Sequence, residues 1–185
     1  MSVTGSTVAI LTAQTGVERA ELEEPMDALI DAGATVVHLA PELGPVQSMV
    51  SDTHPDVTFS PDGTVADASI EDFDLLILPG GTVNADKVRG DAASMALVTQ
   101  FVDAGKPIAA VCHAPWALVE AGVLPGKTLT SFPTLHTDIT NAGGTWVDEE
   151  VFVCPANDWN LITSRSPADL DAFIGAICQL LDEPS

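Results

Sequence analysis

Cys112 and His113 are the pair of residues in this sequence that most directly suggests chemistry. They stand in the stretch KPIAAVCHAPWAL, where a short apolar run ends and a helix-like segment begins. A cysteine at the start of a helix, with a histidine beside it, is in a setting that favours the thiolate and hence a nucleophile. A lone cysteine in an apolar segment is more often a buried packing residue. From this stretch alone, both interpretations remain open.

Two other junctions between apolar runs and helix-like segments are of the same kind. One is 13–21, after the first apolar run, and the other is PGG at 79–81. In open α/β sheets, functional residues gather where strands end and helices begin. The junction at Cys112 has the strand-turn-helix order of a nucleophile elbow, although it lacks the glycines of the G-x-S-x-G form. We therefore look for the site at these three junctions.

The elements that must position these junctions follow from the apolar pattern. Short apolar runs alternate with amphipathic segments, which predicts a mostly parallel sheet with helices on both faces. The expected strands are 7–12, 34–40, 73–78, 107–111, 146–154 and 160–164, the last two forming a hairpin. The expected helices are 20–33, 92–104, 114–122, 135–144 and 166–181. Between them, 41–69 reads as an excursion with short extended pieces around 57–59, and we expect one domain over 1–185.

The charge balance excludes several classes of partner. The chain has 27 acidic and 6 basic side chains in 185 residues, a net charge of -21. We expect no nucleic-acid partner and no anionic membrane partner, because both require a basic face. No apolar run approaches the roughly 18 residues of a membrane span, and the N-terminus lacks the basic region of a signal peptide. Molar salt would screen the self-repulsion of such a surface, which suggests a halophilic source.

The cysteines and histidines do not form a disulfide or metal pattern. Three cysteines are an odd and sparse set, which fits a reducing cytoplasm. Cys178 has helical spacing from apolar neighbours and is expected in the core, and Cys154 ends a strand. The four histidines include no HExxH motif, so we expect no metal site and no cofactor.

Several motifs in one order resemble a known family. The segment AVCHAPWALVEAGVLPGKTLTSFPTLHTDITNAGGTWVDEEVFV resembles the PfpI-type intracellular proteases of the DJ-1/PfpI superfamily. VERAELEEP, FDLLILPGG, VRGD, AGKPIAAVCH and LITSRSPADL extend the resemblance over nearly the whole chain. It implies a flavodoxin-like three-layer α/β sandwich like that of class I glutamine amidotransferases. The G-x-C-x-G and later His-x-Glu motifs of the amidotransferases are absent, so that activity is excluded.

The resemblance also implies roles for particular residues. Cys112 would be the nucleophile, with His113 as its neighbour in the catalytic set. The family's glutamate after the first strand falls on Glu18, which would hydrogen-bond the cysteine sulfur. Gly80 and Gly81 would bind substrate, and the backbone N–H groups of Gly81 and His113 would stabilise an oxyanion. Taken without the resemblance, Glu18 is more simply a surface acid, and the two glycines are turn residues.

Four departures from the family pattern bear on the site. Ala114 replaces the glycine of the elbow, and Phe132 stands where the family has tyrosine. Some members borrow an acid from a neighbouring subunit. That position aligns with Ala92, one residue after Asp91, which either serves as this acid or only caps a helix. His136 replaces a frequent lysine and either lines the mouth of the site or lies on the surface.

The resemblance identifies the catalytic residues more firmly than the reaction that they catalyse. A first hypothesis is a glutathione-independent glyoxalase or deglycase, in which Cys112 attacks a small carbonyl or a glycated amine or peptide. A second is a cysteine peptidase of the PfpI type. A third is a redox-sensing or chaperone-like stress protein whose thiol is oxidised. Members of the family are usually dimers or hexamers, so a homo-oligomer is expected.

Overall fold

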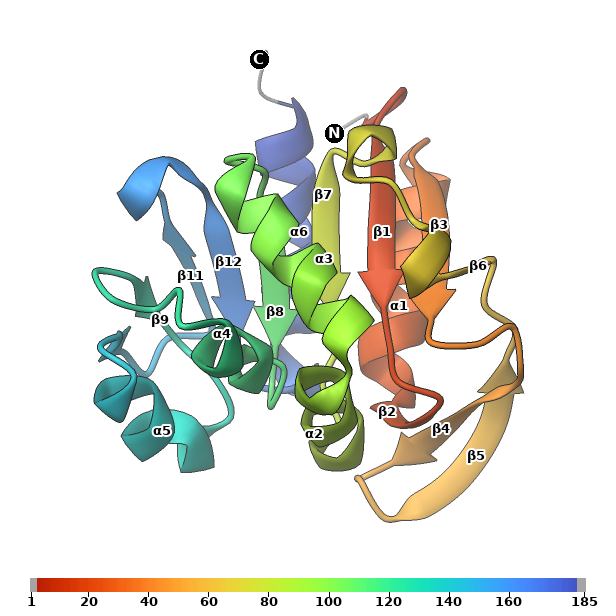
Figure 1. The fold of residues 1–185 in the computed structure, drawn as a ribbon, viewed down its shortest axis with the longest axis horizontal. Helices are drawn as coiled ribbons and strands as arrows, with labels where there is room; N and C mark the ends of the chain where they lie inside the picture. The colour runs from red at the N-terminus through yellow and green to blue at the C-terminus, as the bar shows by residue number, and fades with distance from the viewer. Residues whose placement is uncertain (1–2, 183–185) are drawn as a thin grey trace.

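A seven-stranded sheet forms the centre of the protein in this computed structural model, which describes residues 3–182 (Figure 1). Its strands lie in the order β11-β12-β8-β7-β1-β3-β6. β11 is antiparallel to β12, and every other neighbouring pair is parallel. The strands are β1 (Thr7–Leu11), β3 (Thr35–Ala40), β6 (Gly63–Thr64), β7 (Leu75–Leu78), β8 (Ile108–Val111), β11 (Val151–Cys154) and β12 (Leu161–Ser164).

Helices cover both faces of this sheet. On one face lie α1 (Arg19–Asp31) and α6 (Leu170–Asp182), and on the other α3 (Ala92–Asp103) and α4 (Pro115–Ala121), with α3 nearest the viewer in Figure 1. Side chains alternate along the buried strands, so Leu76 and Ala110 pack toward α3 while Ile77 and Val111 pack toward α1 and α6. This arrangement confirms the expected flavodoxin-like three-layer fold.

The parallel order of the central strands brings three chain segments together. β1, β7 and β8 are completely buried at Leu75–Leu78 and Ile108–Val111 and almost so at Thr7–Leu11. They pair side by side in parallel, so their carboxyl ends meet at one edge of the sheet. The segments after Leu11, Leu78 and Val111 are the three junctions that the sequence singled out.

The excursion after β3 is more ordered than expected. β4 (Val46–Val50) and β5 (His54–Phe59) form an antiparallel hairpin, and β2 (Thr15–Glu18) pairs in parallel with β4. The hairpin turns at Ser51 and Asp52, both of which have positive φ. β5 is almost entirely exposed and mixes polar and apolar residues, which explains why apolar periodicity did not predict the hairpin.

Three further elements lie beside the central sheet. α2 (Thr82–Gly90) was not expected, because it begins directly after Gly81 without a side-chain cap and has little apolar content. α5 (His136–Asn141) confirms the expected short helix. The strand expected over 146–154 is divided, because β10 (Thr145–Trp146) pairs in parallel with β9 (Thr128–Leu129) and only β11 joins the hairpin.

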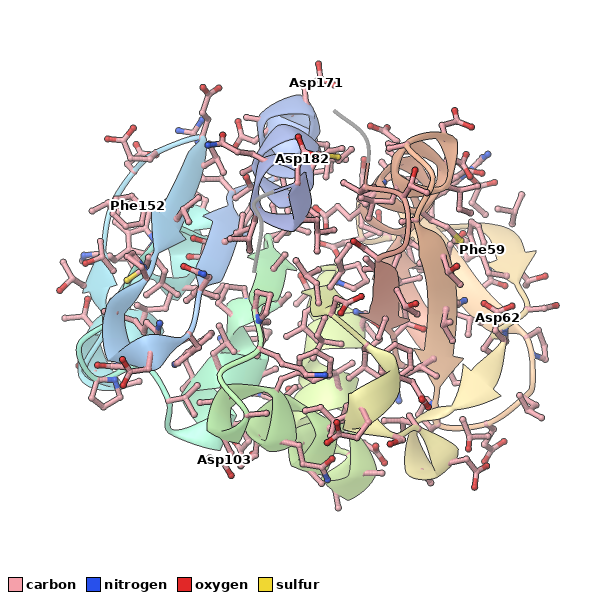
Figure 2. All side chains as sticks on the ribbon, turned by 90° about the horizontal axis from the view of Figure 1, so that it is seen from above. Phe59, Asp62, Asp103, Phe152, Asp171 and Asp182 are labelled. Carbon is pink, nitrogen blue, oxygen red and sulfur yellow. The ribbon has the colours of Figure 1, made fainter. Side chains whose placement is uncertain are left out.

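Acidic side chains project from the surface on several sides. Figure 2 labels four exposed aspartates on different parts of the molecule, Asp62, Asp103, Asp171 and Asp182. None of the helices within residues 3–182 combines the length and the apolar character that crossing a membrane requires.

Candidate active site

Cys112 lies in the elbow between β8 and α4. Its φ is +62°, in the left-handed region that a residue with a side chain adopts rarely and at a cost. The backbone is held on both sides: the Cys112 N–H donates to Ser164 O at 3.0 Å, and the Phe132 N–H donates to Cys112 O at 2.8 Å. The side chain is 6% exposed. Strain supported in this way is typical of a nucleophile elbow.

Glu21 supplies the carboxyl group beside the thiol. Its side chain is fully buried beside Cys112, and Oε2 accepts the Gly80 N–H at 2.8 Å. The other oxygen, Oε1, is buried and has no partner of conventional hydrogen-bond geometry among the described residues. A carboxyl in these surroundings is more stable neutral than ionised.

This position corrects the assignment of the sulfur contact to Glu18. Glu18 ends β2, and its carboxylate accepts the N–H groups of Ser51 and Asp52, each at 3.0 Å. Three residues further along, Glu21 lies on the inner face of α1, together with Leu22 and other core residues. Because Glu18 ends a strand and Glu21 lies in the helix that follows, their side chains point in different directions. Glu18 lies at the rim of the site and Glu21 in its interior.

Gly80 and Gly81 are required by close approach as well as by the turn. A Cβ on Gly80 would lie 2.6 Å from the Cys112 Cβ and would also clash with Glu21 Oε2. Gly81 has φ +88°, and a Cβ there would clash with the backbone oxygen of Gly16. The N–H groups of Gly81 and His113 lie close enough to the Cys112 sulfur to oppose the rise of its pKa.

The pKa of the Cys112 thiol is not lowered, as a helix N-terminus alone would lower it, and the pKa of Glu21 is shifted as well. Burial raises the pKa of Glu21 to about 8; the Gly80 N–H opposes this rise, and the Glu18 carboxylate adds to it. Burial also raises the pKa of Cys112 well above its usual range, with Glu21 adding to the rise and the Gly81 and His113 N–H groups opposing it. Both shifts favour the neutral thiol, so a base beside Cys112 would help to form the thiolate.

His113 is placed to be that base. Its Nδ1 lies 3.2 Å from Cys112 Sγ, and its Nε2 lies 3.4 Å from Thr82 Oγ1. The ring stacks on Phe132 with centroids 4.7 Å apart and meets the edge of Trp116 at 5.3 Å. Burial lowers the pKa of His113, partly offset by the charge of Asp52. A neutral imidazole can accept the proton of the thiol.

The remaining candidate residues are divided between the site and its surroundings. Phe132 contacts His113, and Ala114 has helical backbone angles that do not require glycine. Asp91 caps α3, where its Oδ2 accepts the Ser94 N–H at 2.8 Å. His136 is exposed and packs edge-on against Trp146 at 5.0 Å. Asp91 and His136 make no contact with the thiol or with His113 in the described part of the chain.

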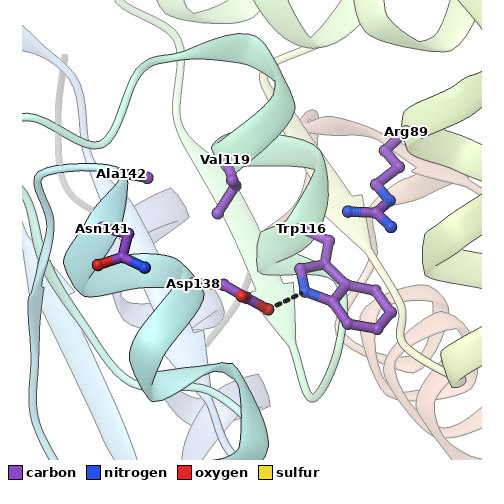
Figure 3. A pocket seen from close by; sticks show the side chains of 6 residues that line it. All are labelled: Arg89, Trp116, Val119, Asp138, Asn141 and Ala142. Atoms are coloured by element: carbon purple, nitrogen blue, oxygen red, sulfur yellow. Dashed lines mark hydrogen bonds between the residues drawn. The ribbon is translucent and has the colours of Figure 1, made fainter.

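An open hollow of about 450 Å³ is lined by Arg89, Trp116, Val119, Asp138, Asn141 and Ala142 (Figure 3). Of these residues, Trp116 also meets the His113 ring with its edge. The Trp116 Nε1–H donates to Asp138 at 2.8 Å, and the Arg89 guanidinium lies 4.7 Å from the centre of the indole ring. Within residues 3–182, no group of three or more His, Cys, Asp or Glu side chains is arranged to hold a metal ion.

The spacing of buried residues along α1 could have predicted that Glu21 faces the interior of the protein. Glu21 precedes the apolar residues of α1 by one and four positions, at Leu22 and Pro25, so it shares their buried face. An acid on an apolar helix face that follows the first strand is a stronger candidate than one at the strand end. Thr82 carries no such signal, because its contact with His113 joins residues 31 positions apart.

Curated relatives with similar sequences carry enzyme names. Deglycase PH1704 of Pyrococcus horikoshii is 42% identical over 111 residues, which are 60% of this chain and 64% of that protein. Protein/nucleic acid deglycase 2 of Escherichia coli is 34% identical over 89% of this chain and 91% of its own length. The putative cysteine protease YraA of Bacillus subtilis is 35% identical over 84% of this chain and 87% of its own length.

Solved structures agree with the fold. A two-domain protein from Anabaena variabilis, with DJ-1/ThiJ/PfpI-like and ferritin-like domains, superposes with a TM-score of 0.86 and 36% identity. The match covers 95% of this chain and 48% of that one. The family model of DJ-1/PfpI matches residues 6–180. The chain therefore belongs to the DJ-1/PfpI family.

Proposed function

We propose that this protein is a cysteine-dependent enzyme that acts on reactive carbonyls, of the glutathione-independent glyoxalase or deglycase type. The observation that carries the proposal is the arrangement around Cys112, where a strained thiol lies 3.2 Å from His113 Nδ1 and contacts the buried carboxyl of Glu21. Such a set supplies a nucleophile, a base and a proton donor. The names of the deglycase relatives support the same reaction class.

The expected course with methylglyoxal begins when His113 takes the proton of the Cys112 thiol. The thiolate adds to the aldehyde carbon, and the N–H groups of Gly81 and His113 stabilise the resulting oxyanion. Transfer of the aldehyde C–H proton to the neighbouring carbon, through Glu21 or His113, converts the hemithioacetal into a lactoyl thioester. Water then releases lactate and restores the thiol. On a glycated substrate, the same attack would free the amine.

The surroundings of the thiol favour a small electrophile over a folded polypeptide. Cys112 is 6% exposed, so only a small part of a substrate can reach it. A peptidase of the PfpI type is the second candidate, favoured by the similarity to YraA. A redox-sensing or chaperone-like stress protein is the third alternative, in which the Cys112 thiol is oxidised.

Lactate production from methylglyoxal without glutathione tests the proposal directly. We expect turnover by the wild-type protein, complete loss in Cys112→Ser, and a loss of about a hundredfold in Glu21→Gln, which keeps the shape but cannot donate an acidic proton. Unchanged turnover in Cys112→Ser would exclude the thiol mechanism. Cleavage of a fluorogenic peptide by the same sample, without lactate formation, would favour the peptidase.

The finer expectations from composition remain proposals. We propose a salt-rich cytoplasm as the setting, supported by the net charge of -21 and the exposed acids. The melting temperature should rise between low and molar KCl, where the Debye length falls to about 3 Å, and equal stability would reject the idea. Assembly into dimers or hexamers is proposed by analogy with the family, and sedimentation in both salts would measure it.

A further inference from the structure

The base function of His113 depends on which ring nitrogen carries the proton. Nδ1 faces Cys112 Sγ at 3.2 Å and can accept the thiol proton only if it is unprotonated. The single proton of the neutral ring must then be on Nε2, which lies 3.4 Å from Thr82 Oγ1. Whatever fixes the direction of that hydrogen bond also decides whether His113 is a base toward the thiol.

Asp52 fixes this direction. Its Oδ1 accepts the Thr82 backbone N–H at 2.7 Å, and its Oδ2 accepts the Thr82 hydroxyl at 3.0 Å. The hydroxyl has one proton, and the Asp52 carboxylate holds it. Thr82 Oγ1 can therefore only accept from His113, which places the ring proton on Nε2.

We propose that Asp52, acting through Thr82, is the positioning acid of His113, and that the set is completed within one chain. This inference rests on the proposed role of Cys112 as nucleophile. It replaces Asp91, which caps α3. When the thiol proton moves to Nδ1, the ring becomes a cation that keeps its Nε2–H on Thr82, and the negative charge of Asp52 balances it through the intervening hydroxyl.

The turn that carries Asp52 is stabilised by the Glu18 carboxylate. Ser51 and Asp52 have φ of +53° and +61°, values that non-glycine residues adopt rarely. The Glu18 carboxylate accepts both of their N–H groups at 3.0 Å and so stabilises the turn. This contact makes Glu18 the residue that orients Asp52, and Asp52, Thr82 and His113 lie between Glu18 and the thiol.

The other groups that face the His113 ring cannot take over this role. Phe132 stacks on one side at 4.7 Å and Trp116 meets the ring at 5.3 Å. Neither accepts a conventional hydrogen bond from Nε2. They restrict the ring to one orientation, and Thr82 then selects the tautomer.

The test is the tautomer of His113, measured by ¹⁵N NMR on the whole chain. In the wild-type protein we expect the proton on Nε2. In Asp52→Asn, the amide donates to Thr82 Oγ1, whose own proton then points at the ring, so the proton should move to Nδ1. Thr82→Val should give a mixture, and Thr82→Ser should restore the wild-type signal. A merely structural role of Asp52 would not reverse the tautomer.

The rate at which iodoacetamide alkylates Cys112 at pH 7 is a second measurement, and it requires no substrate. The rate should fall about tenfold in Asp52→Asn and Thr82→Val, the effect of losing one charge-assisted hydrogen bond. Thr82→Ser should retain the rate. The matched control is Asp56→Asn on the same hairpin, whose carboxylate pairs with Arg19 and should leave both readings unchanged.

Two results would overturn the inference: a wild-type ring protonated on Nδ1, or folded Asp52→Asn and Thr82→Val variants with the wild-type tautomer and alkylation rate. If Thr82→Val does not fold, Asp52→Asn and Thr82→Ser decide the question. Because neither measurement uses methylglyoxal, a wild-type protein that makes no lactate but shows the expected tautomer changes would reject the proposed function and retain the role of Asp52.

Discussion

Two buried polar clusters in this molecule differ in how completely their polar groups are hydrogen-bonded. The thiol cluster consists of Glu21, Cys112 and His113, at the carboxyl edge of the sheet. The lysine cluster consists of Lys127, before β9, and the backbone carbonyls that surround it. Both bury an ionisable side chain completely, at Glu21 and at Lys127. The comparison shows which kind of burial stabilises a fold and which kind serves chemistry.

The lysine cluster satisfies every donor. Lys127 Nζ donates to the backbone oxygens of Cys154, Ala156 and Trp159, and the ammonium lies 3.7 Å from the centre of the Trp159 ring. Burial lowers the pKa of Lys127, partly offset by Cys154. Three N–H groups meet three acceptors, which ties the loop after β11 to the start of β9.

The thiol cluster leaves groups without conventional partners. Glu21 Oε1 has none among the described residues, and Cys112 has φ +62°. Both features cost stability and persist only because the surrounding strands hold them. Because one carboxyl oxygen lacks a hydrogen-bond partner, the cluster can still bind a polar group of a substrate and exchange protons with it. The thiol cluster thus differs from the lysine cluster in combining an unpartnered carboxyl oxygen with a strained backbone at the cysteine.

The largest expected effect separates the two clusters by activity. Cys112→Ser should lower lactate formation by at least about a thousandfold, since a lost nucleophile is not replaced by its neighbours. The free energy of unfolding should change by less than about 1 kcal/mol. Kinetic assay and urea unfolding of the same samples measure both. A large loss of stability with residual activity would reverse the distinction.

The second effect separates the clusters by stability. Lys127→Met should lower the free energy of unfolding by about 3 kcal/mol, because three buried carbonyls lose their donor. Lys106→Met is the control: its Nζ donates to two backbone oxygens in a half-buried position, and water can replace it at about 1 kcal/mol. Equal losses in the two variants would contradict the importance of complete burial.

The third effect uses the titration of Glu21. The folded protein keeps this proton up to about pH 8, whereas the unfolded chain loses it near 4.5. The folded state binds more protons in that window, so Glu21 lowers stability as the pH rises through it. Glu21→Gln does not titrate and should gain about 2 kcal/mol over wild type between pH 4.5 and 8, less than the full shift because buried sites relax.

Urea unfolding of both proteins at several pH values measures this difference. It should level off above pH 8, where Glu21 is ionised in both states. The exposed Glu24 lies on the same helix, so Glu24→Gln should show no comparable trend. A difference between Glu21→Gln and wild type that is flat from pH 4.5 to 9 would show that Glu21 ionises normally.

The smallest effect concerns the cysteine of the lysine cluster. Cys154 is buried, and its sulfur accepts the Thr128 N–H at 3.3 Å, a contact that serine retains. Cys154→Ser should therefore change stability by less than about 1 kcal/mol and leave lactate formation unchanged. Mass spectrometry should find Cys112 alkylated before Cys154, because His113 Nδ1 lies 3.2 Å from the Cys112 sulfur. The opposite order would remove the argument for His113.

Much of the fold could be predicted from the sequence. The fully apolar strands LLIL and IAAV, and the helix that Gly122 ends in a left-handed conformation, follow local rules. The β4–β5 hairpin and α2 did not, because their residues are largely polar and lie in place through tertiary contacts. The divided strand at Trp146 has the same cause: β9, distant in sequence, pairs with it.

Local sequence patterns were enough for the family and the parallel sheet, and they identified Cys112 and His113 as candidates, because the order of motifs and the apolar period can be read along the chain. Which glutamate lies beside the thiol depends on the tertiary structure. Glu18 and Glu21 are three residues apart, and the difference lies in the direction in which β2 and α1 present them. The contact of Asp52 with Thr82 likewise joins segments 30 residues apart, which no local pattern encodes.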